Sequence, residues 1–281
     1  MFAAAFGDAP EGRPVIGWRP EIERLTHEDA QAYYQRFYTP SNAVLLIVGD
    51  VDMDEARDLA LAHYGKIPGR ATVPRERSHF AAMPQGPIVV HHSSVRIPEV
   101  RRMFRVPSPL IDAKIARALD LIDFYLDGTA TAVLRRVLTA DRKVASSVGV
   151  SYFADVFPGE TLLRISASVA EGVSVERLED ELDALLGKIA SDGVPEDALN
   201  RCKRHYEARS MFSIDNQESL GQFVGSKLAL GHTLASTIGW QTSLYDVTVE
   251  DTVRAAALLA PARALRGRLL QGASMTSMAS A

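Results

Sequence analysis

Residues 14–52 of this 281-residue chain, PVIGWRPEIERLTHEDAQAYYQRFYTPSNAVLLIVGDVD, decide its fold. Within them, Thr26 stands three residues before Asp29, the spacing of a capping box at a helix N-terminus. Apolar and aromatic residues then recur with helical spacing as far as Tyr38. Pro40 restricts the residue before it and ends the helix. The pattern therefore predicts a helix that begins just after Thr26 and ends before Pro40.

The second half of this stretch predicts a buried strand and a further helix. Residues 44–48 are five consecutive apolar residues without alternation, as in a strand that is covered on both faces. Asp52 and Glu55 repeat the capping-box spacing and predict a helix over residues 54–64. Together these elements predict a helix–strand–helix unit that packs on a sheet.

The remainder of the chain alternates between strand and helix patterns. Residues 144–152 and 163–169 show period-two alternation around a Pro-Gly turn, which predicts a hairpin. Capping signals at Asp112, Asp215 and Thr248 mark helix starts. Hairpins with helices between them favour an α+β fold with an antiparallel sheet covered by helices. The other predicted elements are strands at 88–92, 100–106 and 265–270, and helices at 115–126, 133–138, 178–189, 195–230 (interrupted near 213–216), 237–246 and 251–259.

The ordered string GW…LT.ED…YY..FYTPSNAVLLIVGDVD…YGKIP resembles the end of the first domain in peptidase family M16. That family contains the pitrilysins, the insulin-degrading enzymes and the mitochondrial processing peptidases. The resemblance covers residues 14–68 closely and continues more loosely to about residue 271. It implies a metalloprotease-like α+β layout built from two related domains, the first of which is represented here only by its end.

The resemblance and the breaks in the pattern together divide the chain. A stretch with several prolines and little periodicity separates the two domains and reads as a connection. The tail after the last predicted strand has no core-forming pattern and is expected to be disordered. The expected parts are an N-terminal arm (1–13), the C-terminal part of a first M16-like domain (14–68), a linker (69–87), a complete second, non-zinc domain (88–271) and a tail (272–281).

Composition excludes several classes of protein. With 47% apolar residues, 23% charged residues and a net charge of −4, the chain is typical of a globular protein and has no evident affinity for nucleic acid or an anionic membrane. The basic cluster of Arg201, Lys203 and Arg204 is interpreted as a solvated helix face. The single cysteine, Cys202, excludes an internal disulfide and is interpreted as a semi-buried, inert thiol.

No stretch approaches the roughly 20 apolar residues that a membrane-spanning helix needs. The apolar residues 1–5 are followed at once by acidic residues and lack a basic region before them, so we do not expect them to form a signal peptide. The expected location is the cytoplasm; a longer natural N-terminus would allow the periplasm.

The resemblance implies zinc chemistry that this chain lacks. The family holds zinc with an HxxEH motif on a helix and a distant glutamate, upstream of the stretch that begins here at Pro14. None of the seven histidines stands in HxxEH or HExxH, and in His27-Glu28 the second histidine is replaced by Gln31. His91 and His92 are adjacent on a predicted strand and point to opposite faces. We therefore expect no catalytic and no metal-binding residue, and zinc only if the missing N-terminal part is supplied.

The family's second feature is an Arg and a Tyr seven residues apart that position the substrate backbone. Aligning that pattern on residues 138–152 places Thr139 at the Arg position and Ser146 at the Tyr position, so both are missing. The chain is similar in this respect to the C-terminal part of bacterial members that carry zinc and borrow the Arg/Tyr pair from a partner subunit. Arg135 and Arg136 are out of register and are interpreted as solvated helix residues, and Tyr152 is out of register as well.

No other catalytic motif is present. The carboxylates of Glu179, Asp180, Glu181 and Asp183 are interpreted as the solvent-exposed face of a helix. Three hypotheses remain. The chain is a truncated M16 peptidase homologue, non-catalytic alone, that contributes one half of a substrate chamber. Alternatively, it is a non-enzymatic structural or binding subunit of an oligomer, or a fragment of a full-length zinc endopeptidase acting on peptides. The expected partners are a second copy or a second M16-like subunit, with a peptide substrate if the site is completed.

Overall fold

The computed structural model describes residues 1–71 and 78–272 and divides into two compact units. The sheet unit comprises residues 1–12, 80–207 and 241–281, and the helical unit comprises residues 13–79 and 208–240. The predicted linker (69–87) and tail (272–281) lie partly outside the described residues. Among the described residues, no helix is long and apolar enough to cross a membrane.

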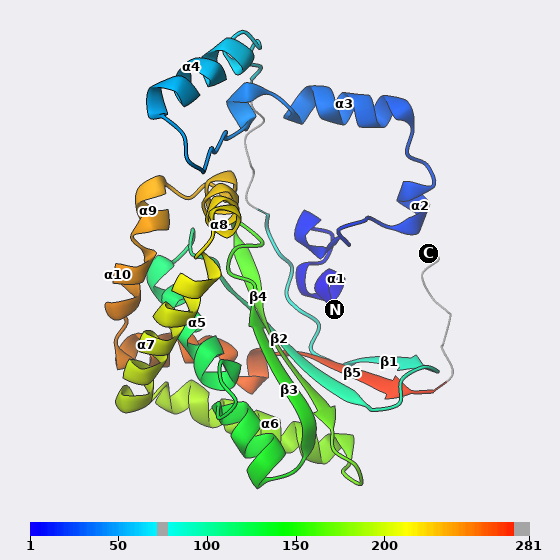
Figure 1. The fold of residues 1–281 in the computed structure, drawn as a ribbon. Helices are drawn as coiled ribbons and strands as arrows, with labels where there is room; N and C mark the ends of the chain where they lie inside the picture. The colour runs from blue at the N-terminus through cyan, green and yellow to red at the C-terminus, as the bar shows by residue number, and fades with distance from the viewer. Residues whose placement is uncertain (72–77, 273–281) are drawn as a thin grey trace. The chain divides into compact units, whose positions relative to one another are not determined.

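The sheet unit is built on one five-stranded sheet with the order β1-β5-β2-β4-β3 (Figure 1). Three of its strand pairs are antiparallel, whereas β1 and β5 are parallel, so the sheet is mixed with a mainly antiparallel character. The α+β fold with a helix-covered sheet, predicted from the sequence, is confirmed. The strands are β1 (Ile88–His92), β2 (Glu99–Pro107), β3 (Ala145–Tyr152), β4 (Glu160–Val169) and β5 (Leu265–Gln271).

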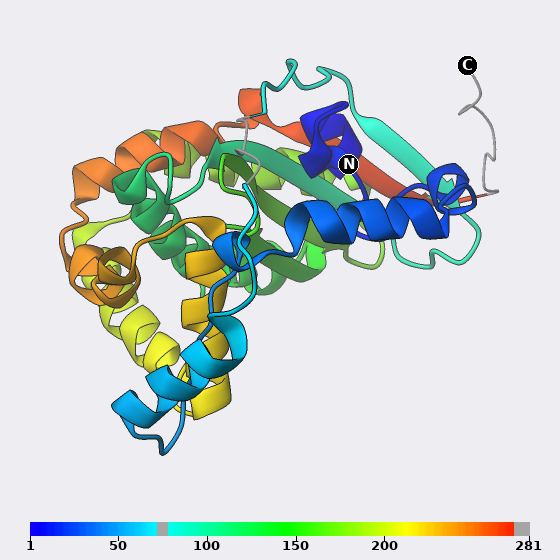
Figure 2. The same cartoon turned by 90° about the horizontal axis from the view of Figure 1, so that it is seen from above.

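One face of the sheet carries the main core. Phe104 of β2 lies opposite Leu163 of β4, and Val100 lies opposite Ala167, so apolar residues of neighbouring strands share this face. They pack with apolar stripes of three helices (Figures 1 and 2). These helices are α5 (Ala113–Asp127), α6 (Val175–Asp192) and α11 (Val249–Ala256).

Local capping signals place the helix starts. The Asp112 carboxylate accepts hydrogen bonds from the backbone amides of Lys114 and Ile115 at 3.1 and 3.0 Å, which starts α5 as predicted. Thr248 and Asp251 form the reciprocal capping box that starts α11. Capping here depends only on neighbouring residues, which explains why it can be predicted from sequence.

The other face of the sheet is covered by the N-terminus, which was expected to be an arm. Helix α1 (Phe2–Phe6) buries Ala5 and Phe6 to 1% exposure against Met103, Leu162 and Leu265. Phe6 also packs edge-on against Phe157, with ring centroids 5.3 Å apart. Residues 1–12 therefore contribute to the core of the sheet unit.

The predicted helix at 133–138 is a π-helix over Arg135–Asp141. The long helical region divides as expected near 213–216, but the cap of its second part is Asn216, not Asp215. The Asn216 side chain accepts from the Ser219 amide at 2.8 Å. These later helices are α7 (Glu196–Ser213), α8 (Gln217–Leu230), α9 (Leu234–Ile238) and α10 (Trp240–Tyr245), with short 3₁₀ turns at Pro10–Gly12, Pro40–Asn42, Ala257–Leu259 and Pro261–Arg263.

The helical unit begins as the sequence predicts. Its helices in residues 13–79 are α2 (Arg19–Ile22), α3 (His27–Phe37) and α4 (Met53–Tyr64). The Thr26–Asp29 capping box starts α3, and the Asp52 carboxylate accepts from the amides of Asp54 and Glu55 to start α4.

The predicted buried strand at 44–48 is wrong. Residues 44–48 are not part of any sheet, and their side chains are 38–53% exposed. Leu46 and Val48 face α8, because a Cβ placed on Gly221 would lie 3.9 and 3.5 Å from their methyl groups. Leu45 and Ile47, which alternate with them, are somewhat more exposed, at 53% and 47% compared with 39% and 38%. A strand needs a hydrogen-bonding neighbour, and none of the described residues supplies one here.

Gly193, which ends α6, offers a test of the fold. Its φ is +68°, and a Cβ there would lie 2.7 Å from Val253 Cγ2 and 2.9 Å from the Val253 amide nitrogen. We expect Gly193→Ala to lower the free energy of unfolding by about 1–3 kcal/mol from backbone strain alone. Gly187→Ala is the control, because it lies inside α6 with open space around it and should stabilise by about 0.5–1 kcal/mol. Urea unfolding measures both; equal effects would contradict this account of Gly193.

Candidate functional site

Thr139 and Ser146, which the resemblance predicts to stand at the family's Arg and Tyr positions, carry short hydroxyls that are hydrogen-bonded locally. The Thr139 hydroxyl donates to the Arg135 carbonyl at 2.5 Å, and the Ser146 hydroxyl donates to the Val169 carbonyl at 3.2 Å. Neither side chain has a cation or a long reach with which to hold a peptide.

The nearby residues that are out of register have structural partners. The Tyr152 hydroxyl donates to the Pro107 carbonyl at 2.6 Å, and burial raises its pKa well above the ordinary value. Arg135, which was interpreted as solvated, forms an ion pair with Asp127 at 3.0 Å. The same Asp127 accepts a hydrogen bond from the amide of Val150 on β3 at 3.3 Å. Asp127 therefore covers part of the outer edge of the sheet.

The donor side chains of the described residues do not fit a zinc site. No three side chains among His, Cys, Asp and Glu converge anywhere in the described ranges. His91 and His92 are adjacent on β1, where His92 interacts with Ser94 and His91 approaches the Gln271 carbonyl at 3.5 Å. His27 lies in the exposed first turn of α3.

A buried charge network joins β2 to α6. Arg102 has 0% exposure, and its guanidinium contacts Asp183 at 2.9 Å and Glu179 at 3.1 Å. Arg268 of β5 also reaches Glu179, at 2.5 Å. Burial raises the pKa of Glu179, but the hydrogen bond from Arg268 and the charge of Arg102 outweigh it and hold the pKa below its usual value. Glu179 and Asp183 therefore do not lie on the solvent-exposed face of the helix, where they were expected.

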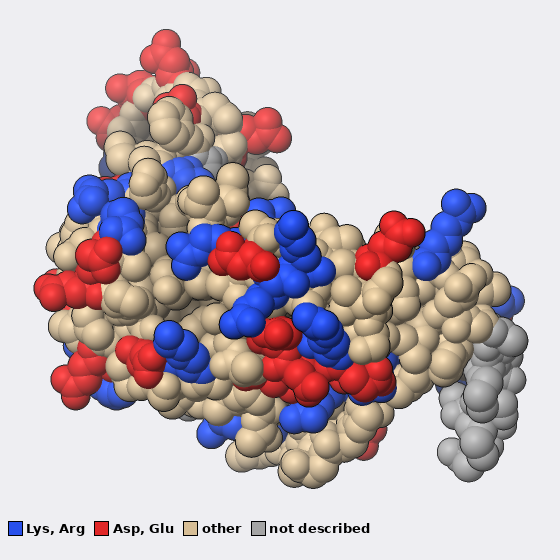
Figure 3. Space-filling view, turned by 90° about the horizontal axis from the view of Figure 1, so that it is seen from below, with Lys and Arg blue, Asp and Glu red and all other residues tan. Residues whose placement is uncertain are grey.

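This network links β2 and β5 to α6, and it does not create a surface of one sign. On the face shown in Figure 3, acidic and basic side chains lie against one another. Lys203 gives a second correction, because it is buried and its ammonium donates to the carbonyls of Tyr245 and Val247 at 3.0 and 2.6 Å. It holds the chain that follows α10 rather than facing solvent.

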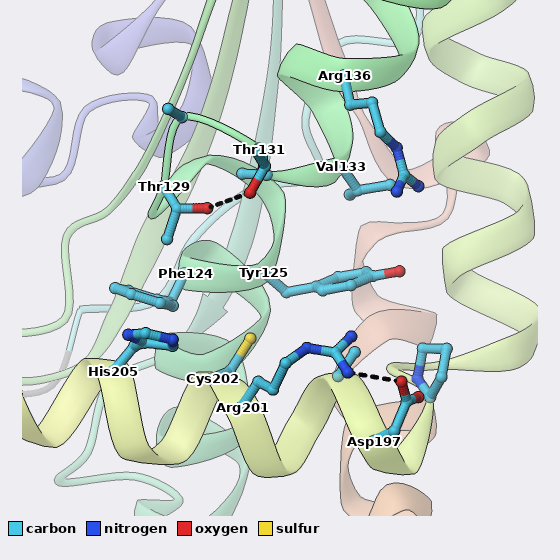
Figure 4. A pocket seen from close by; sticks show the side chains of 14 residues that line it. Phe124, Tyr125, Thr129, Thr131, Val133, Arg136, Asp197, Arg201, Cys202 and His205 are labelled. Atoms are coloured by element: carbon cyan, nitrogen blue, oxygen red, sulfur yellow. Dashed lines mark hydrogen bonds and ion pairs between the residues drawn. The ribbon is translucent and has the colours of Figure 1, made fainter.

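A pocket of about 680 Å³ lies between the end of α5, the loop that follows it and α7 (Figure 4). Phe124 and Tyr125 supply aromatic rings, and Arg136 and Arg201 supply cations. Gly128 lies beside the pocket and leaves no room for a larger side chain, because a Cβ at this position would lie 2.5 Å from the Phe124 ring. The other lining residues are Thr129, Ala130, Thr131, Ala132, Val133, Pro195, Asp197, Ala198, Cys202 and His205.

The charges of this pocket act on its aromatic and acidic groups. Burial raises the pKa of Tyr125, and the positive charges of Arg136 and Arg201 oppose that rise. Arg201 Nη1 lies 2.7 Å from Asp197 Oδ2, and this hydrogen bond lowers the pKa of the Asp197 carboxyl. The sequence predicts that Arg136 and Arg201 lie on helices. Only the fold shows that both side chains line the same pocket.

Cys202 lines the pocket as a buried thiol, as predicted. Burial raises its pKa to about 11 from an ordinary value of 9.0. Because only the thiolate reacts, alkylation near pH 8 should be about 100-fold slower in the folded chain than in the same chain in urea. Thiol labelling followed by mass spectrometry measures both rates. Similar rates in the two conditions would show that Cys202 is accessible and that its pKa is not raised by burial.

The helical unit exposes an unusual amount of apolar side chain. No residue of α3 or α4 is buried within the described structure. Tyr33, Tyr34 and Tyr38 form one exposed aromatic group, with Tyr34 stacked on Tyr38 at 5.1 Å between ring centroids. Residues 44–48 are a second exposed apolar group, and we call this segment alone the open apolar surface. Surfaces of this kind mark sites of association.

A family model described as "Peptidase M16 inactive domain" matches residues 24–206. The chain is 28% identical over 199 residues to an uncharacterized zinc protease of Mycobacterium leprae, and the matched region covers 70% of this chain and 43% of that protein. It is 23% identical over 262 residues to the zinc protease PqqE of Helicobacter pylori, and the matched region covers 91% of this chain and 57% of that protein. The chain thus spans about half the length of these relatives.

Solved structures show the same fold. A protease from Helicobacter pylori matches with a TM-score of 0.83 and 22% identity, over 96% of this chain and 64% of that chain. The M16 inactive domain from Pseudomonas fluorescens matches with a TM-score of 0.77 and 13% identity, over 99% of this chain and 65% of that chain. At these identities the likeness is one of fold.

Proposed function

Because this chain belongs to the peptidase M16 inactive-domain family, we propose that it supplies the non-catalytic half of a zinc-dependent peptidase. The other half carries the zinc and the general base. Together the two halves enclose an unstructured peptide in a chamber. This chain contributes part of the chamber wall and a surface that binds the peptide. Its own residues perform no bond-breaking step.

The open apolar surface is the observation that carries this proposal. Residues 44–48 are apolar, 38–53% exposed and outside any strand pair among the described residues, and of these five it is Leu46 and Val48 that lie near α8. An apolar segment of this kind gains both backbone hydrogen bonds and burial when a sheet edge pairs with it. The relatives, about twice as long, have additional chain that could supply such an edge.

The donor set of the described residues supports a non-catalytic role. It brings no three potential zinc ligands together, and Thr139 and Ser146 cannot replace the Arg and Tyr of the family. Zinc belongs to the proposed partner half and enters no step assigned to this chain.

Mixing the two halves tests the proposal. The part of the Helicobacter pylori protease that this chain does not match would be produced as a separate polypeptide and combined with this chain. Cleavage of a quenched fluorescent peptide is expected from the mixture and not from this chain alone. Absence of both association and cleavage in the mixture would count against the proposal.

A non-enzymatic binding subunit is the second candidate. The short, locally bonded side chains of Thr139 and Ser146, at the positions where the resemblance implies an Arg and a Tyr, favour it. In that case the mixture forms a stable complex but does not cleave. Thr139→Arg with Ser146→Tyr distinguishes the two roles, because restored positioning should raise cleavage by a peptidase half and leave a purely structural subunit inactive.

A further inference from the structure

The pocket between α5 and α7 has the size and the mixture of groups of a ligand site. Its volume of about 680 Å³ falls in the range of about 300–1,000 Å³ that small-ligand pockets occupy. All of its lining residues belong to the sheet unit. The pocket therefore exists within one compact unit and does not depend on how the two units are arranged.

The pocket carries one cation that no described side chain neutralises. Arg201 is paired with Asp197 at 2.7 Å, whereas Arg136 makes no ion pair with any residue in the described ranges. The lining contains two arginines and one aspartate, so its formal charge, with His205 left out of the sum, is +1. Arginine binds carboxylates through charge-assisted and often bidentate hydrogen bonds.

Aromatic rings lie beside these cations. Figure 4 shows the Tyr125 side chain extending between Arg136 and Arg201, with Phe124 next to it above His205. Phe124 is held by an edge-on contact with Tyr206, with ring centroids 5.9 Å apart. The rings offer a fixed apolar surface within reach of the guanidinium groups. A ligand that combines a carboxylate with a neighbouring apolar group matches both features.

We propose that this pocket binds an acidic peptide segment, with a carboxylate at Arg136 and Arg201 and an adjacent apolar side chain on Phe124 and Tyr125. The proposed function contributes only the expectation that the ligand is a peptide. Cys202 takes no part, because its thiol is buried.

Fluorescence anisotropy of the full chain with a labelled peptide of alternating Glu and Phe tests the proposal. One charge-assisted hydrogen bond corresponds to about tenfold in affinity, so Arg136→Gln should weaken binding about tenfold and Arg136→Glu should weaken it further. Arg177→Gln is the control, since it removes the same charge from an exposed position on α6 outside the pocket and should change affinity less than twofold.

The peptide is also varied, with the wild-type protein unchanged. Replacing Glu by Gln identifies side-chain carboxylates as the ligand group, and amidating the C-terminus identifies the terminal carboxylate. Loss of binding with either change supports the proposal. Equal binding of the fully uncharged peptide, equal binding by Arg136→Gln, or no binding at all overturns it. Cleavage is not measured, so this outcome and that of the mixing experiment are independent.

Discussion

Arg102→Ala is expected to lower the free energy of unfolding by about 3–5 kcal/mol. The guanidinium is fully buried and contacts Glu179 and Asp183 at 3.1 and 2.9 Å. Its removal leaves two carboxylates in a partly desolvated position with less compensation. Arg268 still reaches Glu179, so Asp183 loses the larger share of its partners. Urea unfolding followed by circular dichroism measures the loss.

Arg266→Gln provides the matched control. Arg266 lies opposite Arg102 on the neighbouring strand β5 and approaches the same Asp183, but at 3.8 Å and with a side chain that is 44% exposed. Exposed ion pairs contribute about 0–1 kcal/mol, so this variant should change stability by less than 1 kcal/mol. A similar effect of the two substitutions would contradict the role assigned to the buried network.

The same network predicts a dependence on pH. The pKa of Glu179 is lower in the folded chain than its ordinary value of 4.5, so its stabilising contribution is present above that value. The contribution is lost as the pH falls through the folded-state pKa. The Arg102→Ala variant should therefore lose less of its free energy of unfolding than the wild type does as the pH falls.

The second large effect is expected at the open apolar surface. Leu45→Asp with Ile47→Asp places two charges within residues 44–48. We expect the wild-type chain to self-associate or to bind its partner half through this surface, and the double variant to remain monomeric and unbound. Light scattering coupled to size-exclusion chromatography measures the change.

Val156→Asp is the control, because Val156 is an equally exposed apolar residue (50%) in the sheet unit. It should leave association unchanged. Stability should also be little affected in the double variant, since Leu45 and Ile47 are about half exposed. A wild-type chain that is strictly monomeric and binds no M16 half would contradict the role of this surface.

Features that depend on neighbouring residues could be predicted from the sequence. The Thr26–Asp29 and Thr248–Asp251 capping boxes and the β3–β4 hairpin lie where their local patterns place them. The segment at 44–48 could not be placed, because pairing in a sheet depends on a strand from elsewhere. Its composition predicts a strand, and the described chain contains no neighbour for it.

The buried charges were missed although the sequence contains a signal for them. Arg102 takes the place of an apolar residue in the alternation of Val100, Phe104 and Val106. On α6, Glu179 and Asp183 are four residues apart and so share one helix face. Only the fold shows that these two patterns meet. The pocket beside α7 gave no such signal, because its residues come from segments about seventy positions apart.

The zinc content of the purified full chain is the most direct test of the central claim. After dialysis against a metal-free buffer, plasma mass spectrometry of the chain is expected to find far less than one zinc ion per molecule. A tightly held, stoichiometric zinc ion would contradict the assignment of this chain as the non-catalytic half of a peptidase.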